Sequence, residues 1–126
     1  MKLEILSTDK APAAIGPYSQ AVKCGNMLFC SGQIPLDPAT GELVPGDITC
    51  QTMRVMENIE AVLVAADAGF DDIIKTTIYL VDMADFAAVN DVYGKRFPGH
   101  KPARSTVAVK ALPRGAMIEI EVIVSL

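Results

Sequence analysis

The stretch Ile118-Glu119-Ile120-Glu121-Val122-Ile123-Val124 alternates aliphatic residues with glutamates before it becomes fully aliphatic. Successive side chains of a β-strand point to opposite faces, so this alternation predicts a strand with one buried face. The buried face would carry Ile118, Ile120, Val122 and Val124, and the other face Glu119 and Glu121. The fold therefore contains a β-sheet to which this strand belongs.

A second strand is predicted upstream, in Pro102-Ala103-Arg104-Ser105-Thr106-Val107. The same alternation places Arg104 and Thr106 on one of its faces. The turn Leu112-Pro113-Arg114-Gly115 between the two stretches indicates that they form a hairpin. One register of that hairpin would bring Arg104, Thr106 and Glu119 to the same face, although the sequence does not require it.

Arg104 and Glu119 are the strongest candidates for chemistry. An arginine fork binds a substrate carboxylate through two parallel hydrogen bonds, and a glutamate can position a water or exchange a proton. The alternative is a structural ion pair that joins two strands. Because structural ion-pair networks are common, the pattern by itself slightly favours the structural interpretation.

The remaining elements follow from hydrophobic periodicity and turn residues. Strands are predicted at residues 2–6, 20–24, 27–31 and 73–81, a first helix between an N-cap at Asp47 and a C′ residue at Gly69, and a second helix from near Asp82 to Phe97. The apolar stripes of the helices would be Met53, Met56, Ile59, Leu63 and Ala66, then Phe86, Val89, Tyr93 and Phe97. In the strand at 73–81, Ile74, Thr76, Ile78 and Leu80 would share one face. Apolar residues occur on both faces of that strand, which predicts a central position in the sheet.

The predicted order is β-β-β-α-β-α-β-β, which is typical of an α+β domain with a mixed sheet and two helices on one face. Two helices cover one face only, yet Ile123 and several other apolar residues point to the other face. This surplus apolar surface predicts a subunit interface.

Length and charge restrict the class of protein. A chain of 126 residues fits one domain, spanning 1–126. The net charge of −4 and the scattered lysines and arginines argue against a nucleic-acid-binding protein.

The location and the metal content are also constrained by the sequence. No apolar run is long enough to span a bilayer, and the N-terminal segment lacks the apolar stretch of a signal peptide, so a cytoplasmic location is expected. The three cysteines are Cys24, Cys30 and Cys50, and the single histidine is His100. The cysteines form no CxxC pair, and together with the histidine they show no zinc-ligand spacing. We therefore expect neither a disulfide framework nor a metal site.

A set of short motifs along the chain has a known counterpart. The motifs are Ala14-Ile15-Gly16-Pro17-Tyr18-Ser19-Gln20-Ala21, Ser31-Gly32-Gln33-Ile34-Pro35, Gly41-Glu42, Lys75-Thr76-Thr77, the stretch from Asp85-Phe86 to Asn90, Pro102-Ala103-Arg104-Ser105 and Ile118-Glu119-Ile120-Glu121. Together they resemble the reactive intermediate deaminase A (RidA) family, also called the YjgF/YER057c/UK114 family. The resemblance covers essentially the whole chain, and the last two motifs at their spacing are its most specific part.

The resemblance implies a chorismate-mutase-like fold and a homotrimer whose sheets close into a central β-barrel, with active sites between adjacent subunits. It also implies hydrolysis of reactive 2-enamine and 2-imino acids, such as 2-iminobutanoate and 2-iminopropanoate, to 2-keto acids and ammonia. These intermediates form when pyridoxal-phosphate-dependent dehydratases act on serine or threonine, so the implied role is metabolite damage control. The resemblance implies no metal and no organic cofactor for the deaminase itself.

The same resemblance assigns roles to single residues. Arg104 would clamp the substrate carboxylate, and Glu119 would position the attacking water and exchange protons as ammonia leaves. The other residues expected to bind substrate are Tyr18, Ser31, Gly32, Asn90 and Thr106, with Tyr18 contributed by a neighbouring subunit. Thr106 departs from the family, which often has a cysteine there, but its hydroxyl can still hydrogen-bond a water or the substrate.

Two other functions remain open from the sequence. One is a non-catalytic sensor that binds 2-keto acids through Arg104. The presence of Glu119 favours catalysis, because binding alone does not need it. The other is an endoribonuclease or translation inhibitor, against which the acidic charge and the absence of a basic stripe argue.

Overall fold

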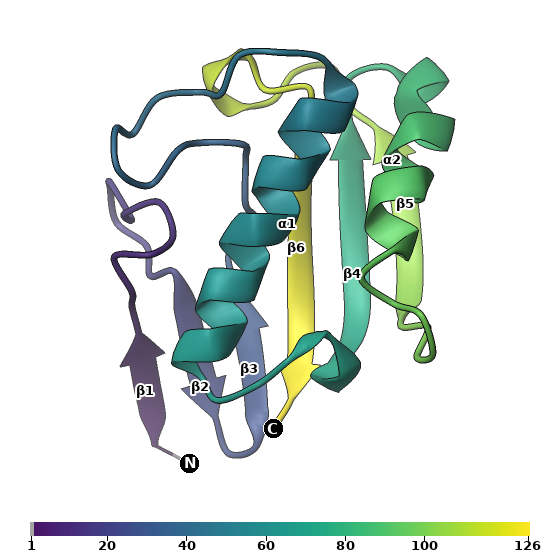
Figure 1. Ribbon diagram of the computed structural model, residues 1–126. Coiled ribbons are helices and arrows are strands. Elements are labelled where there is room, and N and C mark those ends of the chain that lie inside the picture. The colour runs from purple at the N-terminus through teal and green to yellow at the C-terminus, as the bar shows by residue number, and fades with distance from the viewer. Residues whose placement is uncertain (1) are drawn as a thin grey trace.

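The computed structural model describes residues 2–126 and contains the predicted helices and strands in the predicted order (Figure 1). The strands are β1 (Leu3–Leu6), β2 (Ala21–Cys24), β3 (Met27–Cys30), β4 (Ile73–Leu80), β5 (Ala103–Ala108) and β6 (Ile118–Ser125). The helices are α1 (Ile48–Ala65) and α2 (Phe86–Gly94), and short 3₁₀ helices span Phe70–Asp72, Met83–Asp85 and Pro113–Gly115.

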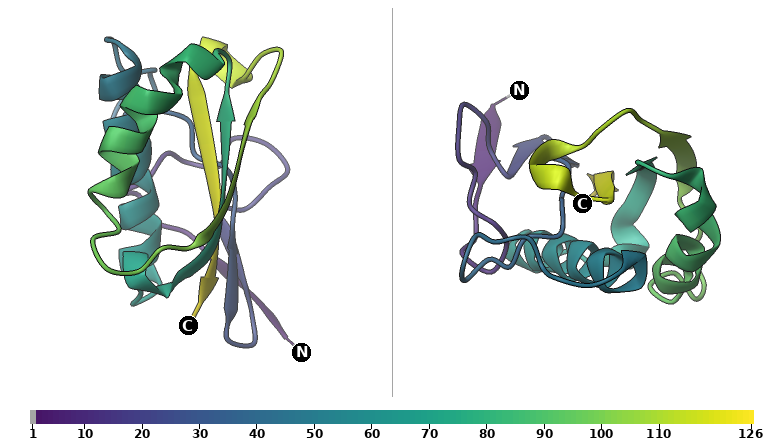
Figure 2. Two further views of the ribbon diagram at one scale, coloured as in Figure 1. Left: turned by 90° about the vertical axis from the view of Figure 1, so that its right-hand side faces the viewer. Right: turned by 90° about the horizontal axis from the view of Figure 1, so that it is seen from above.

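The strands form one mixed sheet in the order β1-β2-β3-β6-β4-β5. β4 and β5 run parallel, and the other neighbouring pairs are antiparallel. Both helices pack on the same face of this sheet (Figure 2). The predicted α+β fold is confirmed, as is the central position of β4, which lies between β6 and β5.

The predicted hairpin between the two C-terminal strands is wrong. β5 pairs with β4 and not with β6, and β6 pairs with β3 and β4. The reason is that β4, α2 and β5 form a crossover unit, in which a helix returns the chain so that β5 lies parallel to β4. The 3₁₀ turn at Pro113–Gly115 therefore belongs to a longer connection that carries the chain past β4 to β6.

The core lies between the sheet and the helices. β6 alternates as predicted, with Ile118, Ile120, Val122 and Val124 buried against the helices. The opposite side of the sheet, which we call the open face, carries Phe29, Lys75, Tyr79, Glu119, Glu121 and Ile123, as the strand registers show. Phe29 is 48% exposed there, so the prediction of apolar residues on this face is confirmed.

The first helix begins where expected, because the Asp47 carboxylate accepts a hydrogen bond from the Cys50 N–H (3.0 Å). Its predicted end and stripe are partly wrong. The helix ends at Ala65, and the left-handed residue beyond it is Asp67 (φ 55°) instead of Gly69. Met53 is 53% exposed and lies outside the core. The buried stripe of α1 runs through Val55, Met56, Ile59, Val62 and Leu63.

The predicted faces of β4 are also partly wrong. Thr76, Ile78 and Leu80 face the core as expected, but Ile74 is 42% exposed and Ile73 is buried instead. The pairing of β4 with β6 shifts register between Ile73 and Lys75. Such an irregularity reverses the alternation at one end of a strand. The apolar stripe of the second helix is confirmed, since Val89, Tyr93 and Phe97 are buried and Phe86 is half-buried.

Candidate active site

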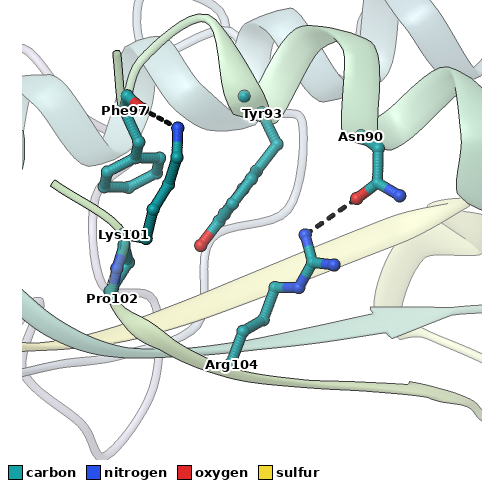
Figure 3. Close-up of a pocket in the computed structure, with 7 residues that line it drawn as sticks. Asn90, Tyr93, Phe97, Lys101, Pro102 and Arg104 are labelled. Atoms are coloured by element: carbon teal, nitrogen blue, oxygen red, sulfur yellow. Dashed lines mark hydrogen bonds between the residues drawn. The ribbon is translucent and has the colours of Figure 1, made fainter. Parts of the chain in front are cut away.

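Arg104 lies on the helix-covered side of the sheet. It is paired in register with Thr76, whose buried hydroxyl shares a hydrogen bond with the Tyr93 hydroxyl of α2 (2.8 Å). Arg104 Nη1 donates a hydrogen bond to Asn90 Oδ1 (2.7 Å), as Figure 3 shows. The guanidinium carbon also lies 5.1 Å from the centre of the Tyr93 ring and 5.3 Å from that of Phe86. One amide and two aromatic rings therefore fix the direction of the guanidinium.

A cavity of about 510 Å³ opens beside this guanidinium (Figure 3). Its lining residues are Asn90, Tyr93, Gly94, Phe97, Lys101, Pro102 and Arg104. The Lys101 ammonium donates a hydrogen bond to the Phe97 carbonyl. The lining contains two cations and no carboxylate, so the cavity suits an anionic ligand.

The structural ion pair between Arg104 and Glu119 is absent from residues 2–126. The salt bridges found in this part of the chain join Arg54 to Glu57, Arg96 to Glu60 and Arg114 to Glu42. Arg104 therefore keeps its carboxylate-binding capacity free within the described chain. The structural interpretation, which the sequence pattern slightly favoured, is wrong.

Burial raises the pKa of the Tyr93 phenol, while its hydrogen bond with Thr76 and the charge of Arg104 act in the opposite direction. The phenol therefore lines the cavity as a neutral hydroxyl at physiological pH. The sequence pattern predicts Tyr93 only as part of the core stripe of α2. The signal for its second role is its spacing of three residues from Asn90, which brings both side chains to one side of the helix.

Thr106 lies on the same face of β5 as Arg104 and pairs in register with Ile78. Its hydroxyl oxygen is buried and has no hydrogen-bond partner among the described residues. A buried polar atom without a partner costs about 1–3 kcal/mol. The site therefore contains an unused hydrogen-bonding group next to the arginine.

Glu119 lies on the open face, opposite Tyr79 in register. Its carboxylate sits directly over Gly32, because a Cβ added at that glycine would lie 2.2 Å from Glu119 Oε2. The segment with Gly32 is held against β6 by two backbone hydrogen bonds between Gln33 and Ile120 (2.8 and 3.1 Å). Only a glycine leaves room for the carboxylate at this distance from the backbone.

Burial raises the pKa of the Glu119 carboxyl, and the negative charge of Glu121 raises it further. A glutamate with a raised pKa is a better proton acceptor than an exposed one. Its position and its chemistry are therefore both suited to general base catalysis.

Ser31 precedes Gly32 in the chain and forms hydrogen bonds to the loop that carries Tyr18. The Ser31 hydroxyl donates to the Ser19 carbonyl (2.6 Å), and the Ser31 N–H donates to the Gln20 carbonyl (2.9 Å). The Tyr18 side chain is 54% exposed and lies on a turn closed by its N–H and the Gly16 carbonyl (2.9 Å). Gly32 and Glu119 are thus in direct contact, and Ser31 links the segment with Gly32 to the Tyr18 loop, whose tyrosine borders a cavity next to β1.

The predicted site residues therefore form two groups on opposite faces of the sheet. Arg104, Asn90 and Thr106 lie on the helix side. Gly32 and Glu119 lie together at the open face, and Ser31 and Tyr18 reach this group only through the hydrogen bonds of Ser31 with the Tyr18 loop. The register that would place Arg104 and Glu119 on one face is not adopted, because β4 separates their strands. Lys101 and Tyr79, which border the two groups, carry no signal in the sequence that singles them out.

Residues 2–126 contain no group of three or more His, Cys, Asp or Glu side chains placed to hold a metal ion. No helix in this range is long and apolar enough to cross a membrane.

Comparisons with known proteins give a consistent result. The family model described as Endoribonuclease L-PSP matches residues 8–126. The chain is 50% identical to "Reactive Intermediate Deaminase A, chloroplastic" of Arabidopsis thaliana, covering 100% of this chain and 67% of the plant protein. It is 48% identical to "2-iminobutanoate/2-iminopropanoate deaminase" of Mus musculus, covering 95% of this chain and 89% of the mouse protein.

A solved structure supports the same relationship. The crystal structure of E. coli TdcF with bound serine superposes with a TM-score of 0.93 at 44% identity, covering 98% of each chain. Because the matches extend over nearly the whole chain at about half identity, with the same fold, this protein belongs to the reactive intermediate deaminase A (YjgF/RidA) family.

Proposed function

We propose that this protein hydrolyses 2-imino acids, such as 2-iminobutanoate and 2-iminopropanoate, to 2-keto acids and ammonia. The observation that carries the proposal is the Arg104 guanidinium, which faces a cavity without a carboxylate partner in the described chain. The name of the mouse relative supports the substrate class. A 2-imino acid has a carboxylate for this arginine and, one bond away, an electrophilic carbon.

Arg104 would bind the substrate carboxylate through its planar fork. Asn90 holds one side of the fork by its 2.7 Å hydrogen bond, so the orientation is set before substrate arrives. Fixing a carboxylate in this way also fixes the position of the adjacent imine carbon. The unpartnered Thr106 hydroxyl is available to a water or to a polar atom of the substrate once access is opened.

Glu119 would act as the base and then as the acid. As the oxygen of water bonds to the carbon of a protonated imine, one proton of the water passes to Glu119. Glu119 returns that proton to nitrogen, the C–N bond breaks with its electrons on nitrogen, and ammonia leaves. The remaining hydroxyl proton leaves through Glu119 as the keto group forms, and protonates the ammonia.

The two groups of residues lie on opposite faces of one sheet, so a single chain cannot present both to one substrate. We therefore place the site between neighbouring subunits of a homotrimer. One subunit supplies Arg104, Asn90 and Thr106, and the next supplies Tyr18, Ser31, Gly32 and Glu119. The apolar residues on the open face, including Phe29, supply surface for such an assembly.

A coupled assay tests the function. A threonine or serine dehydratase generates the imine, and the appearance of 2-keto acid is followed with and without this protein. A faster release of keto acid supports the deaminase. No acceleration, together with binding of 2-oxobutanoate through Arg104, would identify a sensor instead.

Mixing two inactive variants tests the division of the site. We expect coexpressed Arg104→Ala and Glu119→Gln chains, carrying different tags and purified as mixed trimers, to regain activity. In every mixed trimer one of the three sites combines an intact arginine with an intact glutamate, so the purified mixed trimers should have about a third of the wild-type activity per site. If both residues act from the same chain, the mixture stays as inactive as the separate variants.

The close contact at Gly32 gives a further prediction. We expect Gly32→Ala to lower kcat by about 100-fold, because the new methyl group displaces the Glu119 carboxylate by an ångström or more. The displaced atoms are the end of a flexible side chain, so the free energy of unfolding should change by only about 1 kcal/mol. Steady-state kinetics and thermal unfolding measure the two quantities. Gly69→Ala is the matched control, since a Cβ at Gly69 meets no atom within 4 Å.

A further inference from the structure

Next to Glu119 on the open face lies a polar pair that the proposed mechanism does not use. In the β4–β6 register Tyr79 is opposite Glu119, and Thr77 is opposite Glu121. The Tyr79 hydroxyl donates a hydrogen bond to Glu121 Oε1 (2.7 Å). Tyr79 therefore starts beside one glutamate and reaches diagonally across the strands to the other.

The hydrogen bond fixes the position of a negative charge close to Glu119. The two glutamates are two positions apart on one strand, so their Cα atoms are about 7 Å apart and their side chains leave the same face. Without a partner, the Glu121 side chain could move its carboxylate into solvent. The Tyr79 hydroxyl restricts it to a fixed site on the sheet.

No cation neutralises Glu121 in the described part of the chain, where every salt bridge involves other residues. Lys75 on β4 also lies on the open face, but its ammonium donates to the Ser105 hydroxyl of β5 (3.0 Å). The segment 31–33 that packs against Glu119 contributes no charged side chain. Of the described chain, the charged and titratable groups that face Glu119 are thus Glu121, Tyr79 and Lys75.

Tyr79 is suited to remain a donor at physiological pH. Its hydrogen bond to Glu121 raises the pKa of its phenol, with smaller contributions from burial and from the charges of Glu121 and Glu119. The pair is therefore a neutral phenol that donates a hydrogen bond to the Glu121 carboxylate. In the trimer described above, Arg104 of the neighbouring subunit would lower the proton affinity of Glu119, and it would do so equally in every variant that keeps Arg104.

We propose that Tyr79 and Glu121 are positioning residues for imine hydrolysis: Tyr79 holds the Glu121 carboxylate beside Glu119, and the Glu121 charge makes Glu119 a stronger base toward the attacking water. This inference rests on the deaminase function proposed above. It adds a second carboxylate and a phenol that act through Glu119 without touching substrate. Burial and the Glu121 charge both raise the pKa of the Glu119 carboxyl, in agreement with this geometry.

The test compares Glu121→Gln and Tyr79→Phe with wild type as assembled, full-length proteins. Two readouts are used: the pH dependence of kcat/KM, and the titration of the Glu119 carboxyl followed by ¹³C NMR in glutamate-labelled protein, with the signal assigned by Glu119→Gln. Glu4→Gln, which removes an exposed carboxylate on β1, is the control for a general loss of negative charge.

We expect Glu121→Gln to move both the Glu119 titration and the acidic limb of the profile to lower pH by about 0.5–1 unit. Tyr79→Phe should move them less, because the Glu121 charge remains but is no longer held in place. The rate at neutral pH should fall several-fold in Glu121→Gln, since a weaker base accepts the proton of water less readily. Glu4→Gln should change neither readout.

Three other results would each overturn the proposal. If the Glu119 titration does not move in Glu121→Gln, the proposal is overturned whether or not wild type is active. If the titration moves and the rate profile does not, the two carboxylates interact but the reaction does not use the interaction, which also overturns it. If wild type hydrolyses no imine, the proposed function fails and this inference fails with it, a result that the wild-type assay alone identifies.

Discussion

Arg104→Ala is expected to lower kcat/KM for imine hydrolysis by about 10³-fold, because truncating one partner of a hydrogen-bonded charge pair costs about 2–5 kcal/mol. Most of the loss should appear in the binding of the substrate carboxylate and in its orientation. Calorimetry with 2-oxobutanoate, the keto acid formed from 2-iminobutanoate, measures the binding part directly. The coupled assay measures the total loss in kcat/KM, and the difference between the two measurements gives the part due to substrate orientation.

Arg104→Lys separates charge from geometry. Lysine keeps the positive charge but loses the planar fork, the hydrogen bond to Asn90 in its present geometry and the stacking on Tyr93 and Phe86. We expect a loss of about 10–100-fold, smaller than for alanine. Arg54→Lys, on the outer helix α1, is the matched control and should retain wild-type kinetics. An Arg104→Ala protein with more than a tenth of wild-type kcat/KM would contradict the assignment of the clamp.

Glu119→Gln is expected to lower kcat by about 10²–10⁴-fold, the usual contribution of a positioned general acid or base. The glutamine has nearly the same shape, so the change removes proton transfer while it keeps the packing over Gly32. Binding of 2-oxobutanoate should persist in this variant. A sensor would keep its affinity for keto acid in Glu119→Gln. If this affinity is unchanged and the wild type itself catalyses no hydrolysis, the catalytic role of Glu119 is contradicted.

The pH dependence of the wild type provides a second measurement of Glu119. The base form of the carboxyl is the deprotonated one, so activity falls as the pH decreases through its pKa. Burial and Glu121 raise that pKa, whereas Arg104 of the neighbouring subunit in the proposed trimer would lower it, so the position of the acidic limb reports the balance of these effects. This limb should disappear from the residual activity of Glu119→Gln.

Patterns that depend on neighbouring residues predicted much of the fold. The alternation in Ile118–Val124 correctly assigned the buried and open faces of β6, because side-chain direction in a strand has a period of two residues. The stripe through Val89, Tyr93 and Phe97 correctly oriented α2, because helical neighbours recur every three or four residues. The hydrogen bond from Cys50 to Asp47 confirmed the start of α1.

The incorrect predictions concern properties that local patterns do not determine. The turn at Pro113–Gly115 suggested a hairpin, but strand order depends on the return path through α2, which places β5 beside β4. The exposed Ile74 results from a register shift between β4 and β6, which involves residues about fifty positions apart in the sequence. Neither a crossover nor a bulge leaves a signal within a short window of sequence.

For the candidate site, residue chemistry and the family resemblance indicated Arg104 and Glu119 as candidates, but the sequence could not show that they face opposite sides of the sheet. That relation depends on β4, which is paired with both strands. The contacts of Arg104 with Asn90 and Tyr93 likewise depend on how α2 lies over β5. Side-chain type thus indicates the chemistry, while long-range pairing determines which groups meet.

The placement of Arg104 and Glu119 on opposite faces also has a consequence for how activity scales with the amount of protein. If the site is divided between subunits as proposed, a newly synthesised chain that has not met its partners would hold no complete site and would not convert substrate. Specific activity should therefore decline on dilution below the dissociation constant of the assembly, instead of staying constant. A cell that makes little of this protein would then lose the proposed deaminase activity more steeply than the abundance of the protein falls.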